Sequence, residues 1–315
     1  MIEAHGLTKR YGDKTVVDGM TFTVQPGKVT GFLGPNGAGK STTMRMIVGL
    51  DRPTAGSVTV NGRPYAQHRA PLGEVGVLLE AKAVHGGRSA RDHLLAQAAT
   101  HGIGARRVDE VIDLTGLGPV ARRRAGTFSL GMGQRLGIAA ALLGDPQTLI
   151  LDEPVNGLDP EGVLWVRTLL RRLAAEGRAV FLSSHLMSEM ALTADHLVVV
   201  GRGRVVADAP VAEIVARAGT SAVRVRTPDA PRLAALLVRD PSIEVRSTGA
   251  DLLDVTGSTA PAVAALAASV GIVLHEIAPV QASLEDAYLQ LTGGEVEYRS
   301  ASATTQPRHT AGAPR

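Results

Sequence analysis

One stretch near the N-terminus constrains the fold of this chain more than any other, GFLGPNGAGKSTTMRMIVGL at residues 31–50. It starts in an apolar run typical of a strand, passes through a glycine-rich loop and continues as a helical pattern. The loop fits the arrangement G-x-x-x-x-G-K-[ST], whose glycines let backbone N–H groups face phosphate oxygens. A strand, such a loop and a helix in this order predict an α/β domain that binds a phosphorylated ligand.

The loop supplies the first candidate binding residues. Lys40 is expected to reach the β- and γ-phosphates of a nucleotide, and the Ser41 hydroxyl to ligate Mg²⁺. The competing interpretation, a glycine-rich turn with a solvated lysine, is weakened by the strand before the loop and the helix after it. The nucleotide-binding residues expected here are Gly34, Pro35, Asn36, Gly37, Ala38, Gly39, Lys40, Ser41 and Thr42.

Two carboxylates follow a second apolar run, TLILDEP at residues 148–154. Ligands of α/β sheets bind at the carboxyl ends of the strands. Asp152 is therefore expected to hold Mg²⁺, usually through water, and Glu153 to polarise an attacking water as general base. A single acid at a strand end is more simply explained by exposure to solvent, but a pair downstream of a phosphate loop favours catalysis.

Two further side chains have both a structural and a functional interpretation. His185 ends the strand-like run FLSS. A lone histidine is more often structural, yet at the end of a sheet strand its imidazole is able to hydrogen-bond a γ-phosphate and a water. Tyr11 follows the charged run LTKR. Alone it is a surface aromatic, and its flat face also permits stacking on adenine.

The run FSLGMGQRLGIAAAL at residues 128–142 reads as a helix with an unusual beginning. Gly131, Gly133 and Gly137 each cost a helix interior roughly 1 kcal/mol relative to alanine. A helix start with Ser129 and glycine exposes unpaired N–H groups and the positive end of the helix dipole. We therefore predict that this helix start holds a phosphate.

The order of apolar runs predicts how the chain is organised. Near-continuous apolar runs such as TLILD and AVFLSS are typical of a sheet covered on both faces, in an α/β domain. The β signal disappears between about residues 82 and 145, which predicts a helical subdomain. The strands expected in the first part of the chain lie at 21–24, 28–34, 57–60, 74–79, 148–152, 179–184 and 196–200.

The character of the chain changes after about residue 218. Residues 219–295 show the order strand, helix, strand, strand, helix, strand, helix, which predicts a small α+β accessory domain of ferredoxin-like type. Residues 296–315 have no period, and we expect them to be a disordered tail.

Composition excludes several classes of protein. The chain has no cysteine, so thiolate metal sites and thiol nucleophiles are excluded. A formal charge of +3 with only 3% aromatic residues disfavours nucleic acid as a partner, since stacking platforms are scarce. No apolar run approaches the roughly 18 residues of a membrane span. We expect a cytoplasmic protein that reaches the membrane only through a partner.

The ordered motifs KRYG, GPNGAGKST, FSLGMGQR, LILDEP, NGLDP and SSH resemble those of the ATP-binding subunits of ABC transporters, over about residues 1–218. The whole pattern is similar to the ATPases of bacitracin- and daunorubicin-type drug exporters. The resemblance implies a P-loop NTPase core with a helical subdomain, and ATP and Mg²⁺ as cofactors. It also implies that Tyr11 stacks on adenine and that His185 is the switch histidine. Residues 129–133 would be the signature motif, with phosphate contacts from Ser129 and Gly131, and residues 156–159 would be the D-loop.

The chain departs from the family pattern in two places. The signature has Leu130 and Met132 where glycine and glutamine are usual. Glu80 stands where the family has a glutamine that contacts Mg²⁺. A carboxylate is also able to ligate Mg²⁺, although it adds negative charge beside the phosphates. We expect Glu80 to be a metal ligand, with simple exposure at a strand end as the alternative.

The expected function is ATP hydrolysis that energises export of a drug, antibiotic or lipid-like solute. Two copies are expected to bind two ATP molecules face to face, each phosphate loop facing the other copy's signature. A separately encoded membrane permease would be contacted around RSARDHLLAQ, residues 88–97, and would hold the protein at the inner face of the membrane. The alternatives are a non-transport or regulatory ATPase of this type, and an importer.

Overall fold

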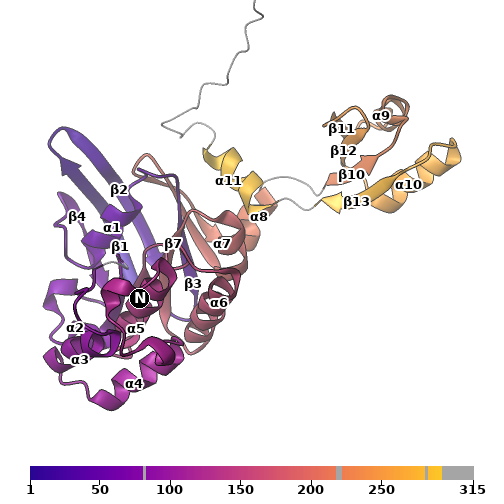
Figure 1. Cartoon of the computed structure of the whole chain (residues 1–315). Coiled ribbons are helices and arrows are strands. Elements are labelled where there is room, and N and C mark those ends of the chain that lie inside the picture. Colours follow the sequence, from indigo (N-terminus) through magenta and orange to yellow (C-terminus); the bar gives the residue numbers. More distant parts are fainter. Residues whose placement is uncertain (81–82, 218–221, 281–282, 293–315) are drawn as a thin grey trace, which may run out of the picture.

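The computed structural model describes residues 1–80, 83–217, 222–280 and 283–292. The tail expected at 296–315 lies outside the described residues. Three sheets and their helices make up the described chain (Figure 1). In this part of the protein no helix is long and apolar enough to cross a bilayer.

The central sheet is parallel except at one edge. Its strand order is β5-β6-β7-β3-β8-β9, and β9 alone runs antiparallel to its neighbour. All residues of β3, β6 and β7 are buried, as expected for a sheet covered on both faces. The α/β class is therefore confirmed. The strands are β5 (Val75–Leu78), β6 (Thr148–Leu151), β7 (Ala179–Ser184), β3 (Val29–Leu33), β8 (His196–Gly201) and β9 (Arg204–Pro210).

A second, antiparallel sheet covers part of the central one. Its order is β2 (Lys14–Val24), β1 (Ile2–Tyr11) and β4 (Ala55–Val60). The rings of Phe22, Phe32 and Phe181, from β2, β3 and β7, join the two sheets with centroids 5.1–5.7 Å apart. Strands β1 and β9 were absent from the sequence prediction, because β1 is interrupted by register shifts and both strands expose polar residues.

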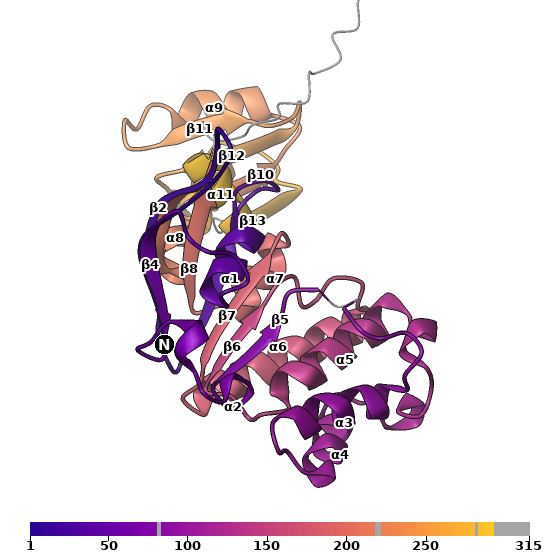
Figure 2. The same ribbon diagram turned by 90° about the vertical axis from the view of Figure 1, so that its left-hand side faces the viewer.

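The segment expected to be helical folds as helices stacked beside the central sheet. Figure 2 shows α5 beside β5, with α3 and α4 farther from the sheet. The close approach of α5 to β5 depends on Gly137, because a Cβ there would lie 2.5 Å from Leu78 Cδ1. One of the three glycines is thus explained by packing rather than by phosphate. The helices are α3 (Ala90–Thr100), α4 (Ala105–Leu114) and α5 (Leu130–Leu142).

Two of the remaining helices in the first part of the chain, α6 and α7, connect strands of the central sheet, whereas α1 and α2 lie on either side of β4 in the sequence and α8 follows β9. Helix α6 follows β6 and α7 follows β7, so both begin near the carboxyl ends of strands. Their bounds are α1 (Lys40–Ile47), α2 (Pro71–Glu74), α6 (Pro160–Ala175), α7 (Met187–Thr193) and α8 (Val211–Arg217).

The segment 222–280 has its own sheet and its own core. The sheet order is β11-β12-β10-β13, and its buried residues form a hydrophobic cluster with those of α9 and α10. The element order is the βαββαβ order expected from the sequence. The elements are β10 (Ala222–Arg226), α9 (Ala230–Leu237), β11 (Glu244–Ser247), β12 (Leu252–Thr256), α10 (Ala260–Ser269) and β13 (Glu276–Val280).

The last described helix, α11 (Leu284–Thr292), does not belong to that core. Leu284, Ala287 and Tyr288 are buried in the main cluster, against α7 and α8 (Figure 1). The sequence analysis placed this helix in a unit at 219–295. In the structure the segment 222–280 instead lies between two helices, α8 and α11, that pack on the body formed by the first part of the chain.

Candidate nucleotide site

The glycine-rich loop joins β3 to α1. Gly37 and Gly39 have φ of +84° and +94°, a region in which glycine is favoured. A Cβ on Gly39 would lie 2.8 Å from the carbonyl oxygen of Val16, so the loop also packs closely on β2. Helix α1 then begins at Lys40, and its first N–H groups face the space beside the loop.

Lys40 is buried against its own loop. Its Nζ donates to the carbonyl oxygens of Gly34 at 2.6 Å and Pro35 at 3.2 Å. Burial lowers the pKa of Lys40, while the negative charges of Glu153 and Asp152 raise it. The ammonium group is thus held by two neutral carbonyls next to two carboxylates, where it is available to a more negative ligand such as a phosphate.

A cavity of about 320 Å³ lies between the loop and the end of β6. It brings together predicted residues that are far apart in the sequence, which is the arrangement expected for a phosphate site at the end of a parallel sheet. The residues that line it are Val16, Asn36, Gly37, Gly39, Lys40, Ser41, Thr42, Leu79, Asp152 and Glu153. The predicted residues Gly34, Pro35 and Ala38 of the loop are not part of this lining. Gly34 and Ala38 are buried, and a Cβ on Gly34 would lie 2.5 Å from the carbonyl oxygen of Val200.

The donors in this cavity fit Mg²⁺. The Ser41 hydroxyl and the Asp152 carboxylate supply hard oxygen ligands, and Mg²⁺ usually takes its other ligands from phosphates and water. Among the described residues no group of three or more His, Cys, Asp or Glu side chains is placed to hold a metal alone. The arrangement thus suits a metal that arrives with a nucleotide.

The two acids after β6 are held by the end of β7. Ser183 donates a hydrogen bond from its Oγ to Asp152 Oδ1 and accepts one from the Glu153 N–H at 3.0 Å. His185 Nδ1 lies 2.8 Å from Glu153 Oε2. The structure therefore places His185 beside Glu153, as a catalytic pair requires. The sequence analysis missed Ser183, whose only signal was its position two residues before the histidine.

Apart from the loop residues named above, three predicted binding residues lie outside the set of described residues that line this cavity. Tyr11 is 48% exposed, donates to Asp51 Oδ2 at 3.1 Å and has Lys9 Nζ 4.9 Å from its ring centroid. Ser129 caps α5, accepting the Met132 N–H at 3.2 Å, and Gly131 lies in the first turn of that helix. Their roles toward a nucleotide stay predictions.

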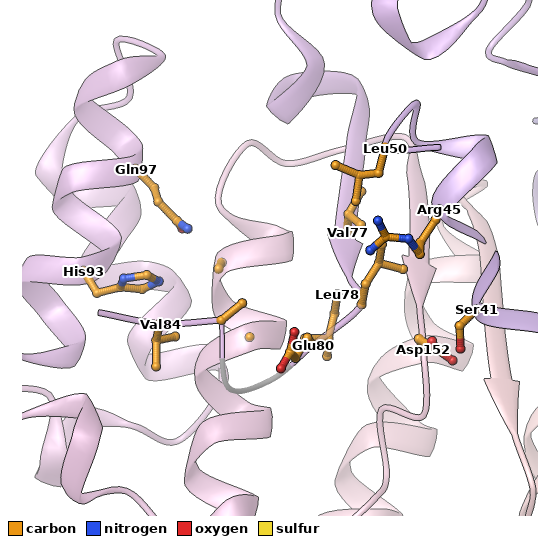
Figure 3. A pocket seen from close by; sticks show the side chains of 14 residues that line it. Ser41, Arg45, Leu50, Val77, Leu78, Glu80, Val84, His93, Gln97 and Asp152 are labelled. Carbon is orange, nitrogen blue, oxygen red and sulfur yellow. The ribbon is translucent and has the colours of Figure 1, made fainter. Parts of the chain in front are cut away.

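Glu80 is exposed two residues beyond β5. It lines a neighbouring cavity of about 500 Å³, whose wall also includes Ser41 and Asp152 (Figure 3). On the other side of this cavity lie His93 and Gln97 of α3. Both the predicted metal contact and simple exposure are consistent with this position, so the ligand role of Glu80 stays a prediction.

Comparisons with known proteins agree with this geometry. The family described as ABC transporter matches residues 17–156, and a domain of unknown function matches residues 221–285. The Nod factor export ATP-binding protein I of Rhizobium sp. (strain N33) is 37% identical over 94% of this chain and 98% of its own length. The bacitracin transport ATP-binding protein BcrA of Bacillus licheniformis is 41% identical over 67% of this chain and 70% of its own.

A solved structure described as the ATP-binding subunit of an ABC transporter is similar at a TM-score of 0.63. It has 28% sequence identity and covers 69% of this chain and 92% of its own. These relatives agree with the motifs and with the cavity that brings the motifs together. The chain belongs to the ATP-binding subunits of ABC transporters and is an ATPase of that family.

Proposed function

We propose that two copies of this chain bind two ATP molecules between them, each with Mg²⁺, and hydrolyse them to energise export through a separate membrane subunit. The observation that carries the proposal is the division of the site. The cavity beside the glycine-rich loop contains Lys40, Asp152 and Glu153, whereas Ser129 and Gly131 lie outside its lining. A second copy that presents its own α5 N-terminus to this cavity would complete the site.

Four of the predicted residues bind the nucleotide or its metal in this proposal. Lys40 would exchange the carbonyls of Gly34 and Pro35 for the β- and γ-phosphates. Ser41 and Asp152 would hold Mg²⁺, which neutralises phosphate charge when bound. Tyr11 would stack on adenine.

The hydrolytic step is proposed to centre on Glu153. Its carboxylate accepts a proton from a water as the water oxygen bonds to the γ-phosphorus, and the bond from that phosphorus to the β–γ bridging oxygen breaks. His185, 2.8 Å from the Glu153 carboxylate, would hold the γ-phosphate and fix the direction of this base.

The larger cavity is the proposed docking site for the membrane subunit. It lies between β5 and α3, the helix that the sequence analysis assigned to this contact (Figure 3). Two of its polar atoms, His93 Nδ1 and Gln97 Oε1, are buried without a hydrogen-bond partner among the described residues. A buried group without a partner costs free energy, so docking that turns these two side chains toward polar groups of the membrane subunit would gain by pairing them. Bound to such a partner, the chain would lie at the inner face of the membrane.

The name of one relative favours export over import. That relative is named for Nod factor export, and another relative is named for bacitracin transport. We propose that the solute moved here is likewise a drug, an antibiotic or a lipid-like molecule. We also propose that the chain divides into an ATPase unit over 1–218 and an accessory unit within 219–295, because two different family models match residues 17–156 and 221–285.

The test of this proposal is the variant Glu153→Gln of the full chain. Removing the general base should abolish phosphate release from ATP, while the slowly hydrolysed nucleotide should hold two copies together in gel filtration. Undiminished hydrolysis, or a monomer at saturating ATP and Mg²⁺, would contradict the proposal. A permease that copurifies with the chain, and antibiotic sensitivity of cells that lack the chain, would separate export from the alternatives.

A further inference from the structure

Glu153 has a backbone conformation that needs support from its surroundings. Its φ of +50° lies in the left-handed region, which is unfavourable for a residue other than glycine. The Glu153 carbonyl accepts the Asn156 N–H at 3.1 Å and Gln134 Nε2 at 2.8 Å, and its own N–H donates to Ser183 at 3.0 Å. Hydrogen bonds from three separate segments therefore hold this one residue.

Gln134 is the member of this set that the sequence analysis did not single out. It lies in α5 and is only 5% exposed. Its second amide atom, Oε1, is buried and has no partner among the described residues. Burying a half-satisfied amide is unfavourable, and an apolar side chain of the same size would avoid that cost. Among the described residues, the hydrogen bond to the Glu153 carbonyl is the contact that offsets this cost.

We propose that Gln134 is a positioning residue for Glu153. By holding the Glu153 carbonyl, its amide fixes the rotation of the peptide that follows, and with it the direction in which the Glu153 side chain leaves the backbone. That direction places the carboxylate beside His185. The inference rests on the proposed function, because it takes Glu153 as the general base. Gln134 itself lies outside the set of described residues that line the nucleotide cavity.

The position of Gln134 in α5 extends this role. The first turn of the same helix carries Ser129 and Gly131, the residues proposed to face the other copy's nucleotide. That turn packs closely on the loop after Glu153, since a Cβ on Gly131 would lie 3.0 Å from the Gly157 carbonyl oxygen. A shift of α5 on binding the second nucleotide would therefore reach the chain's own Glu153 through one hydrogen bond.

The test uses Gln134→Leu in the full chain, which removes the amide donor and the unpaired acceptor while keeping most of the volume. We expect kcat for phosphate release to fall by roughly 10- to 100-fold, because small misplacements of catalytic groups have effects of this size. KM for ATP with Mg²⁺ should stay within about two-fold, because binding contacts are untouched. The melting temperature should not fall. The matched control is Gln147→Leu at an exposed glutamine, which should match the wild type in all three measurements.

Gln134→Glu adds a readout that a packing role would not produce. A neutral carboxyl group donates an O–H to the Glu153 carbonyl, whereas a carboxylate does not. Burial raises the pKa of a carboxyl group, so the introduced acid should be neutral at the lower end of the working range. The ratio of variant to wild-type kcat should therefore be highest at low pH and fall as pH rises.

Two results would overturn the inference. One is a kcat of Gln134→Leu within about two-fold of the wild type. The other is a loss of kcat in which the melting temperature falls in step and the Gln134→Glu ratio is independent of pH. If Glu153→Gln abolishes hydrolysis in the same assays, the proposed function stands and the positioning role alone has failed. If Glu153→Gln hydrolyses ATP normally, the proposed function itself has failed.

Discussion

Truncation of a buried leucine in α11 tests whether the end of the described chain stabilises the ATPase body. Leu284 is 3% exposed and packs in the main core, whereas Leu289 of the same helix is 58% exposed. Truncating a buried leucine to alanine costs about 2–5 kcal/mol, and a position at the start of a helix, where the chain is able to relax, favours the lower half of that range. Leu284→Ala should then cost about 2–3 kcal/mol, and Leu289→Ala under about 0.5 kcal/mol.

The assay is thermal unfolding of the full chain with and without ATP and Mg²⁺. The transition that shifts upward with nucleotide belongs to the nucleotide-binding body, because a ligand stabilises the unit that binds it. For a body of this size 1 kcal/mol moves the midpoint by about 2–4 °C, so Leu284→Ala should lower that transition by about 4–12 °C. The docking of α11 would be refuted if Leu284→Ala and Leu289→Ala lowered this midpoint equally. It would also be refuted if Leu284→Ala changed only a transition whose midpoint does not shift with nucleotide.

Three further changes probe the site and its surroundings. Ser183→Ala removes the hydroxyl that donates to Asp152 and accepts from the Glu153 N–H. We expect kcat to fall by about 10-fold or more with little change in the melting temperature, whereas an unchanged kcat would show that these two hydrogen bonds are dispensable. Burial lowers the pKa of His93, and the nearby positive charges of Arg88 and His85 lower it further. The His93 imidazole therefore binds a proton more readily in the unfolded chain than in the folded chain. Stability should therefore decrease as pH falls below the ordinary histidine value of about 6.5, and His93→Gln should flatten this decrease in melting temperature; equal slopes would contradict the assignment. Glu80→Gln should change the Mg²⁺ dependence of hydrolysis if Glu80 is a metal ligand, whereas activity within about three-fold at every Mg²⁺ concentration would leave it a surface residue.

The sequence predicted the central sheet well where burial is complete. The runs at β3, β6, β7 and β8 are apolar because both faces of the sheet are covered, so their signal is strong. Strands β1 and β9 expose polar residues and carry register shifts, which removes the alternation that sequence reasoning depends on.

The site could be predicted as far as its residues belong to local motifs. Lys40, Asp152 and Glu153 stand in such motifs, and the structure brings them into one cavity. Gln134 and Ser183 owe their importance to contacts with Glu153 across 19 and 30 residues of sequence, which no local pattern records. The same holds for α11, whose amphipathic pattern predicts a helix without saying which core it joins.

In the proposed dimer a single chain contains half of each nucleotide site. The chain has no cysteine, so introduced thiols are unique. Two variants in the Glu153→Gln background, one with Asn36→Cys and one with Ser129→Cys, are mixed and treated with a short thiol-specific cross-linker. With ATP and Mg²⁺ we expect cross-links that join the two different variants, and we expect none with ADP or between copies of one variant. Cross-links that form without ATP, or that join only copies of the same variant, would contradict it, as would their absence from a mixture that gel filtration shows to be dimeric.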